Sequence, residues 1–404
     1  MKKFLVLSLT LFTAFVVAAC GTSDRPDFQM MWFSDGTEGQ VMRELLERYR
    51  DETGVYIELF EIGWDVYETR LGTMIDGGEA PALVRTTEGV MNNFKDLLIE
   101  LDDVFDTTAY TNIFYSANNL PLGLPMDVTA NGLFVNTDIL DRCGVEYPVR
   151  GDEDIWTWDE FTTEMDKLRD CDDVSVPGVF DFQGHRFMAM IYQQGVKIWN
   201  EPFTDSNLTS PEAVQALTIL HDFYQNGMIS KEVFVSGGAA AEMFQTGTVG
   251  FHMSGNWRVS GYGDNDFEWA VIPMPTGPEG HRATLLGGKA MSAVQGSGNE
   301  QAAKDFIAWL AEPANHDEFN NFVPFLSARI GAEIDFGEFQ EAYSMFQDEI
   351  NATDPAFVSD WLTQTQIPGM YPMINLMTDR AAEGVMTPLE ILEALEASLI
   401  AAME

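Results

Sequence analysis

The sequence of 404 residues is poor in cysteine and in positive charge. It has three cysteines, and only 22 lysines and arginines stand against 64 aspartates and glutamates. A surface with this balance repels the phosphates of nucleic acids and the headgroups of anionic lipids, so we expect neither as a direct partner. The acidic residues are spread along the chain rather than gathered in a tail, which indicates a solvated surface of high charge.

The common signatures of catalysis are also missing. The run from Gly287 to Ala290 lacks both the first glycine and the hydroxyl of a phosphate loop, and Ser254 follows His252 rather than the glycine of a nucleophile elbow. There is no HExxH pattern, and the five histidines are scattered without the spacing of metal ligands. No pair among the many carboxylates stands out as suited to glycoside hydrolysis. We therefore predict a protein without a cofactor or a metal.

A long apolar run occurs only at the N-terminus. Two lysines precede the apolar stretch from Phe4 to Val17, and Ala-Ala-Cys follows, ending at Cys20. The run is too short to span a bilayer comfortably, and this order resembles the signal peptide and lipobox of bacterial lipoproteins. The resemblance implies a signal peptide over residues 1–19, diacylglycerol on the Cys20 sulfur and a lipidated tether over residues 20–27. We expect an extracytoplasmic protein that is lipid-anchored to the cell membrane, at the cell surface or in the periplasm.

The other two cysteines, Cys143 and Cys171, would share this oxidising space. No CxxC or Cys/His spacing connects them to a metal, and the segment between them is long enough to loop back. Two outcomes stay open, a disulfide or two free thiols. Labelling with a thiol reagent, with and without reductant, distinguishes them.

Strand-like and helix-like segments alternate in the first part of the chain. Apolar runs indicate strands over residues 28–33, 55–60 and 82–85, and a helical period of apolar residues lies between them. Gly54 and the pair Gly77-Gly78 stop the two helices. This order is typical of an α/β fold with a parallel sheet. The chain length, with 46% hydrophobic residues, predicts two domains.

Helix starts recur farther along the chain. Thr157-Trp-Asp-Glu160 and Thr387-Pro-Leu-Glu390 have the pattern of capping boxes, and Ser210-Pro211 offers a cap followed by a proline. We also expect Asn299 to cap the helix that follows it.

Several short motifs occur in a characteristic order along nearly the whole chain past residue 27. They are residues 71–81 (LGTMIDGGEAP), 123–125 (GLP), 131–136 (NGLFVN), 157–160 (TWDE), 242–257, 272–275 (IPMP), 287–288 (GG), 303–310 (AKDFIAWL) and 384–388 (GVMTP). Each motif is weak alone, but their order and spacing resemble the extracellular solute-binding proteins of ABC importers, the family 1 group that includes maltose-binding protein.

The resemblance implies an α/β, two-domain fold of the periplasmic-binding-protein type (type II), with an interdomain ligand cleft and a hinge. The chain would cross between the lobes near residues 125–132 and again near residues 271–275. A ligand would bind in the cleft, and the hinge would close the lobes over it. The implied N-terminal lobe comprises residues 28–127 and 274–316, and the C-terminal lobe comprises residues 128–273 and 317–404.

The stretch MFQTGTVGFHMSGNW, residues 243–257, ends a predicted strand with small residues followed by a tryptophan. The resemblance implies that this loop brings Trp257 to the cleft, where its ring can stack on the C–H face of a sugar. Ser254 and Gly255 would let the backbone approach the ligand, and Asn256 would offer an amide to its hydroxyls. The alternative is that Trp257 packs in the core of the second lobe.

Other candidate ligand contacts come from positions that match cleft loops of the family or from the carboxyl ends of parallel strands. Gln183-Gly-His185 replaces an acidic-proline-aromatic triplet of the maltose binder, so the resemblance does not extend to maltose itself. The candidates are Trp32, Ser34 and Asp35 after the first strand, Thr86, Thr87 and Glu88 after the third, Asp127 at the first crossing, and Gln183, His185, Gly288 and Tyr371.

We therefore predict the substrate-binding lipoprotein of an ABC importer, which captures a mono- or oligosaccharide without catalysis. It would act as a monomer and deliver the sugar to permease subunits in the membrane. One alternative is a binder of another small polar solute, such as a glycerol phosphodiester or a polyamine. The others are a surface glycosidase and a scaffold lipoprotein that has lost transport.

Overall fold

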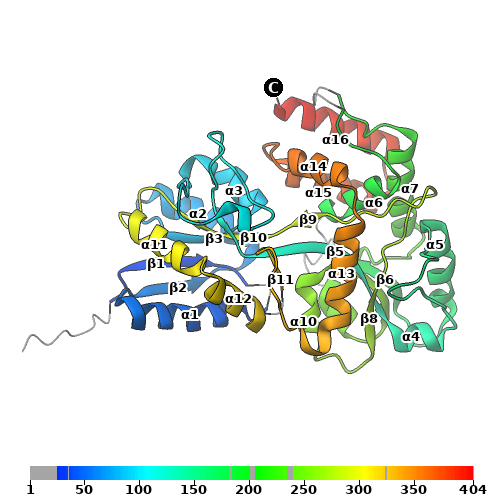
Figure 1. Ribbon diagram of the computed structural model, residues 1–404. Coiled ribbons are helices and arrows are strands. Elements are labelled where there is room, and N and C mark those ends of the chain that lie inside the picture. The colour runs from blue at the N-terminus through cyan, green and yellow to red at the C-terminus, as the bar shows by residue number, and fades with distance from the viewer. Residues whose placement is uncertain are drawn as a thin grey trace, which may run out of the picture.

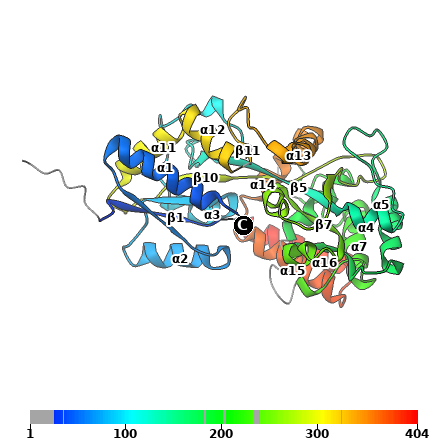
Figure 2. The same ribbon diagram turned by 90° about the horizontal axis from the view of Figure 1, so that it is seen from below.

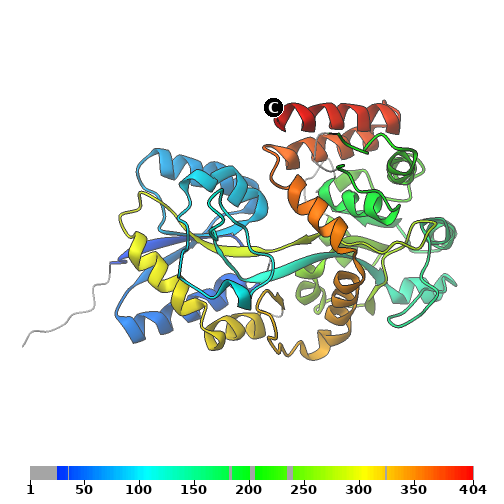
Figure 3. The same cartoon turned by 45° about the horizontal axis from the view of Figure 1, so that its top comes forward.

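The computed structural model describes residues 25–34, 36–181, 184–200, 205–233, 240–323 and 325–403. These residues form two α/β lobes that lie side by side, with strands β5 and β9 running from one lobe to the other (Figure 1). The view from below in Figure 2 and the tilted view in Figure 3 show the same separation. No helix in the described ranges is both long and apolar enough to span a membrane.

The N-terminal lobe contains a five-stranded sheet in the order β2-β1-β3-β10-β4. Strands β1, β2 and β3 are parallel, which confirms the parallel α/β order predicted for this region, and β10 is antiparallel to β3 and β4. The elements are β1 (Phe28–Trp32), α1 (Glu38–Thr53), β2 (Ile57–Glu61), α2 (Trp64–Asp76), β3 (Leu83–Thr87), α3 (Glu88–Phe94), β4 (Leu124–Pro125), β10 (Lys289–Ala293), α11 (Glu300–Leu310) and α12 (Pro313–Phe322), with short 3-10 turns at Lys95–Leu97 and Thr107–Ala109.

This sheet is buried on both faces. Successive side chains of a strand point to opposite faces, so Met30 and Trp32 of β1 pack with α1, α11 and α12, whereas Met31 and Phe33 pack with α2 and α3. A strand covered on both sides is an almost continuous apolar run, as the sequence FQMMWF shows.

The C-terminal lobe is built around a sheet in the order β11-β5-β7-β6, with β8 and β9 also paired to β5. Its core includes residues of α14, α15 and α16, the last helices of the chain, which cover this lobe in Figure 1. The elements are β5 (Asp127–Asn136), α4 (Thr137–Arg142), α5 (Trp158–Asp166), β6 (Val176–Phe180), α6 (Met188–Gln193), α7 (Pro211–Gln225), α9 (Ala240–Gln245), β7 (Val249–Gly255), α10 (Val259–Tyr262), β8 (Trp269–Ile272), β9 (Leu286–Gly287), β11 (Leu326–Ser327), α13 (Gln340–Ala352), α14 (Pro355–Gln364), α15 (Met370–Glu383) and α16 (Pro388–Met403), with 3-10 turns at Lys167–Asp170, Gly184–Phe187, Asn256–Arg258 and Gly337–Phe339.

The chain crosses between the lobes where β5, β9 and β11 pair. The first crossing lies on β5, which begins at Asp127. The structure puts the return later than residues 271–275, because Met274, Ala283 and Leu285 are buried in the core of the C-terminal lobe and the chain returns only through β9 and β10. Pro273 and Pro275 end β8, but Thr276 donates its N–H to the carbonyl of Trp156, 2.8 Å away, and keeps this segment on the C-terminal lobe.

The last boundary also differs from the expected one. Helix α12 contacts α1, and Phe319 and Phe325 lie in the core of the N-terminal lobe. The N-terminal lobe therefore extends past residue 316 to the start of β11, and its second segment covers about residues 288–325 rather than 274–316.

The predicted helix starts can be checked individually. Both capping boxes are present, at Thr157 with Glu160 and at Thr387 with Glu390, and Ser210 accepts from the N–H of Ala213. Asn299 occupies the N-cap position of α11, but its side chain does not cap the helix and donates instead to the carbonyl of Ser297.

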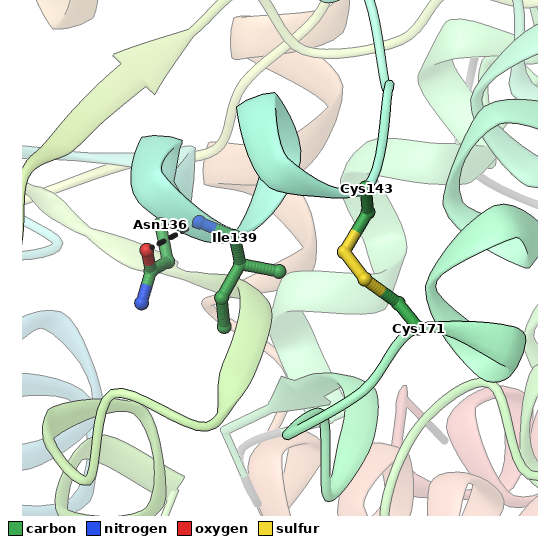
Figure 4. Close-up of a disulfide and its surroundings, with 4 residues drawn as sticks. All are labelled: Asn136, Ile139, Cys143 and Cys171. Atoms are coloured by element: carbon green, nitrogen blue, oxygen red, sulfur yellow. Dashed lines mark hydrogen bonds between the residues drawn. A yellow bond between two sulfur atoms is a disulfide. The ribbon is translucent and has the colours of Figure 1, made fainter.

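A disulfide joins Cys143 to Cys171, with their Cα atoms 5.8 Å apart (Figure 4). The sequence left a disulfide and two free thiols open, and the structure contains the disulfide. The bond connects the end of α4 to the end of the 3-10 turn Lys167–Asp170.

Candidate functional site

The start of α3 lies at the boundary between the lobes. A methyl group added at Gly89 would lie 3.0 Å from the ring of Tyr371, which belongs to α15 of the C-terminal lobe. The preceding residue, Glu88, is 5% exposed, and Asn112 donates to its Oε1 from 3.5 Å. Burial raises the pKa of Glu88 to about 7. A carboxyl group that is protonated in part near neutral pH can donate to, and accept from, the hydroxyls of a ligand.

A buried set of paired charges supports this boundary. Arg85 donates to Glu38 Oε1 at 2.9 Å and to the carbonyl of Phe33 at 2.5 Å. Asp127 accepts from the backbone N–H of Lys289 at 3.0 Å, and its Oδ2 lies 3.8 Å from the Arg85 guanidinium and 3.9 Å from the Lys289 ammonium. Asp127 is fully buried. It therefore orients two cations here, and its predicted contact with ligand hydroxyls stays a prediction.

Trp32 is also fully buried. Its ring contacts the edge of Phe319, the Arg85 guanidinium lies 4.6 Å from its centroid, and its Nε1 donates to Ser34 Oγ at 3.1 Å. Ser34 in turn donates to Glu61 at 2.5 Å. Trp32 thus fixes the half-buried Ser34 rather than presenting a face of its own ring.

The two threonines that end β3 also have partners within the N-terminal lobe. Thr86 is buried and bonds to the carbonyl of Ala290 at 3.2 Å and to Ser292 Oγ at 3.0 Å. Thr87 caps α3 by accepting from the N–H of Val90. These bonds hold the turn that presents Glu88.

The loop after β7 brings Trp257 to the same boundary from the other lobe. Its partly buried ring packs against the core of the N-terminal lobe. The Arg186 guanidinium lies 4.8 Å from the centroid of this ring, and the Lys289 ammonium lies 5.8 Å from it. A Cβ at Gly255 would lie 2.0 Å from the ring, so only glycine fits there. The preceding residue, Asn256, is fully buried, and its side chain bonds to the backbone of β5.

A polar network holds Arg186 in place. Asp181, which directly follows β6, lies 3.1 Å from the Arg186 guanidinium and 2.8 Å from His252 Nε2, and it accepts from Ser254 Oγ at 2.5 Å. His252 Nδ1 bonds to Tyr262 at 2.5 Å. Burial opposes ionisation of Asp181, but the charges of Arg186 and His252 and the hydrogen bonds prevail and hold its pKa far below the usual range. Asp181 is therefore the anionic anchor of this network.

Three aromatic rings of the C-terminal lobe gather beside Glu88. His185 stacks on Trp361 with centroids 6.3 Å apart and meets the edge of Tyr371 at 5.4 Å. Trp361 donates its Nε1 to the carbonyl of Leu286 in β9. Burial and the neighbouring Arg186 lower the pKa of His185 well below its ordinary value, so its imidazole is neutral. A neutral imidazole between aromatic rings suits an uncharged polar ligand.

One exposed aromatic residue was not predicted. Trp64 begins α2, is 44% exposed and packs on Phe33, 4.8 Å away between centroids. It follows β2 just as Ser34 follows β1, so the rule that ligands sit at the carboxyl ends of parallel strands points to it. Its exposed face makes it a second candidate for stacking.

The predicted residues divide into three groups. Glu88, His185, Trp257, Gly288 and Tyr371 gather with Arg186, Lys289 and Trp361. Trp32, Thr86, Asp127 and Asn256 support them from buried positions, and the half-buried Ser34 and Thr87 lie at the carboxyl ends of β1 and β3 with partners in the N-terminal lobe. Asp35, Gln183 and Cys20 lie outside the described residues.

Two surface cavities of about 550 and 590 Å³ lie on the C-terminal lobe. They are lined by residues of α13 and α14 and of α5 and α7, respectively, and contain none of the gathered residues. The gathered residues, and not these cavities, join both lobes and therefore form the candidate ligand site.

Known proteins resemble this chain in sequence and in fold. Residues 44–335 match the family model of the bacterial extracellular solute-binding proteins. The arabinooligosaccharide-binding protein of Bacillus subtilis is 26% identical over 263 residues, which cover 61% of this chain and 54% of that protein. The chain spans about half the length of the curated relatives it matches.

Two solved structures have the same fold. The substrate-binding protein Lmo0181 of Listeria monocytogenes, in complex with cycloalternan, superposes with a TM-score of 0.79 at 21% identity, over 94% of this chain and 99% of that one. UgpB of Mycobacterium tuberculosis, in complex with glycerophosphocholine, gives a TM-score of 0.76 at 18% identity over the same shares. These likenesses confirm the predicted two-domain fold of the periplasmic-binding-protein type.

Proposed function

The chain belongs to the bacterial extracellular solute-binding proteins, and on this premise we propose that it is the substrate-binding component of an ABC importer for a mono- or oligosaccharide. The observation that carries the proposal is the position of Trp257, which comes from the C-terminal lobe and packs at the N-terminal lobe beside Lys289. An aromatic ring held between two lobes can stack on a sugar when the lobes open and retain it when they close.

The surrounding groups suit hydroxyls. Glu88 with its raised pKa, the neutral His185 and the backbone at Gly288 offer donors and acceptors without a single dominant charge. Tyr371, Trp361 and the exposed Trp64 would add apolar surface for further sugar rings. The names of the relatives, which include an arabinooligosaccharide binder and a protein bound to cycloalternan, support an oligosaccharide.

A second candidate ligand is a glycerol phosphodiester. Arg186 and Lys289 both lie beside the Trp257 ring, and guanidinium and ammonium groups bind phosphate. Asp181 and Asp127 lie near these cations and oppose an anion, which is why we favour the neutral sugar. The glycosidase alternative is not kept, because the family consists of transport proteins rather than enzymes.

The remaining parts of the proposal concern place and partners. The family is extracytoplasmic. We infer that the lipid on Cys20 tethers a monomer to the membrane and that the loaded, closed form docks on the permease. A polar segment of seven residues, 21–27, separates the lipidated cysteine from β1.

The test is a thermal-shift screen of the protein lacking residues 1–19, against sugars, polyols, glycerol phosphodiesters and polyamines. A ligand at one hundred times its dissociation constant adds about 2.7 kcal/mol to the free energy of unfolding, enough to raise the melting temperature by a few degrees. A response to one sugar series supports the proposal, and a response to phosphodiesters alone moves it to the second candidate. No response from any solute would contradict it.

Trp257→Ala examines the stacking directly. Loss of a buried aromatic anchor should weaken sugar binding at least tenfold, as measured by calorimetry, while the circular dichroism stays unchanged. Trp309→Phe, in helix α11 away from the site, is the matched control and should bind as the wild type does. Unchanged affinity in Trp257→Ala would remove this residue from the site.

A further inference from the structure

Asn256, the residue before Trp257, is joined to the strand on which the lobes meet. It is fully buried, and both polar atoms of its side chain are used. Oδ1 accepts from the N–H of Ala130 at 3.1 Å, and Nδ2 donates to the carbonyl of Val128 at 3.0 Å. Both partners belong to β5, 126 and 128 residues away in the sequence.

These bonds continue a ladder that the backbone leaves incomplete. Strand β7 pairs with β5 up to Gly255 opposite Asn131, and β11 pairs with β5 at Asp127 and Val128. In an antiparallel ladder, alternate residues of a strand direct their N–H and C=O to the same edge, so Val128 and Ala130 share one edge of β5. The Asn256 amide supplies one acceptor and one donor there, as a backbone residue would.

The opposite edge of β5 has a comparable arrangement. Thr284 Oγ1 accepts from the N–H of Asn131 at 2.8 Å and donates to its carbonyl at 2.9 Å. Asn131 lies between the part of β5 that pairs with β8 and the part that pairs with β9. Two side chains, one on each edge, thus complete the hydrogen bonding of β5 where the chain passes between lobes.

Asparagine is well suited to position 256. Val128 and Ala130 are buried, and a buried backbone group left without a hydrogen-bond partner destabilises the folded state. Alanine would leave both groups unpaired. Aspartate would keep the acceptor, lose the donor to Val128 and add a buried charge.

From this geometry, and resting on the proposed sugar-binding function, we propose that Asn256 is a positioning residue that fixes Trp257 to the crossing strand β5. The tryptophan and the hinge are then parts of one unit. Rotation of the lobes about β5 carries the Trp257 ring toward or away from Lys289. A ligand that stacks on this ring is therefore coupled to closure of the lobes through Asn256, although Asn256 does not contact the ligand.

Three variants test this role. Asn256→Ala removes both hydrogen bonds to β5. Asn256→Asp removes only the donor and is used if the alanine variant does not fold, and Thr284→Val removes the bonds on the opposite edge.

In the ligand-free protein we expect exchange of the Ala130 amide to rise at least tenfold in Asn256→Ala, as measured by hydrogen–deuterium exchange. We expect the Trp257 resonance, assigned in 5-fluorotryptophan ¹⁹F spectra by its loss in Trp257→Phe, to shift or broaden. Thr284→Val should affect the Asn131 amide and leave the Trp257 resonance in place.

Binding gives the second readout. Asn256→Ala should weaken binding of the ligand found in the thermal-shift screen at least fivefold. In the Trp257→Ala background it should cause no further loss of affinity, because Asn256 acts through the Trp257 ring. Full additivity would show direct contact with ligand and overturn the proposal. An unchanged Trp257 resonance would overturn it as well, and that result does not depend on a ligand, so it is distinct from failure of the sugar-binding function.

Discussion

Glu88 is a carboxylic acid enclosed by both lobes. Asn112, Asp127, Lys289 and Tyr371 contact it or act on its charge, and burial is the largest influence on its pKa. Because the pKa is about 7 in the folded protein and near 4.5 in the unfolded chain, the folded state holds this proton more tightly. The free energy of unfolding then falls as pH rises from about 4.5 to about 7, by up to about 3 kcal/mol.

Glu88→Gln should remove this contribution. Between pH 4.5 and pH 7.5 the wild type should lose about 3 kcal/mol of unfolding free energy relative to Glu88→Gln, because only the wild type has the carboxyl group that titrates. Urea denaturation at each pH measures this difference. Comparing the two proteins cancels the titration of other groups. Glu153→Gln, at an exposed position, is the control for the substitution itself. A pH-independent difference for Glu88→Gln would show that folding does not change the pKa of this carboxyl group.

At the scale of single residues, the sequence predicted which side chains lie at the lobe boundary better than what each of them faces. Glu88, Trp257 and Tyr371 do gather at the lobe boundary. Asp127 and Asn256 lie beside them, but their polar atoms pair with groups far along the chain, such as Ala130 for Asn256. Asp181 was missed although it follows a strand directly, and the rule that selected Glu88 would have found it.

Helix α4 illustrates stabilisation at the scale of an element. It has only six residues, too few for a stable helix alone, yet both of its ends are fixed (Figure 4). Asn136 accepts from the N–H of Ile139 at its start, and Cys143 at its end is bonded to Cys171 across a separation of 28 residues. Closing a loop of this length stabilises the folded state by about 3 kcal/mol.

The double variant Cys143→Ser/Cys171→Ser should therefore unfold at lower urea, with a loss of about 2 to 4 kcal/mol. Reductant should weaken the wild type by a similar amount and leave the variant unchanged, which serves as its control. Equal stability of wild type with and without reductant, together with two thiols that react in the folded protein, would contradict the bond.

The elements themselves were predictable where local chemistry decides them. The capping boxes at Thr157 and Thr387 and the parallel order of β1, β2 and β3 follow from the sequence. The return to the N-terminal lobe and the last lobe boundary did not follow, because the short strands β9 and β11 are defined only by pairing with β5. Such pairings depend on residues more than a hundred positions apart and produce no local periodicity of apolar residues in the sequence.

For the molecule as a whole, the dominant feature is its charge. The net charge is −42, and repulsion among carboxylates on one surface opposes a compact state. Buried ion pairs such as Arg85 with Glu38 do not relieve it, because they neutralise only themselves. The repulsion acts across both lobes and depends on the distance over which salt screens it, about 10 Å at 0.1 M and 3 Å at 1 M.

The melting temperature should therefore rise by a few degrees as sodium chloride increases from about 0.02 M to about 0.5 M, measured without ligand. Choline chloride at equal ionic strength is the matched control, since screening depends on charge and not on the identity of the cation. Equal rises in both salts would show general screening of the acidic surface. A rise in sodium alone would indicate specific ion binding, and a flat response would mean that the carboxylates are already far enough apart for water to screen them.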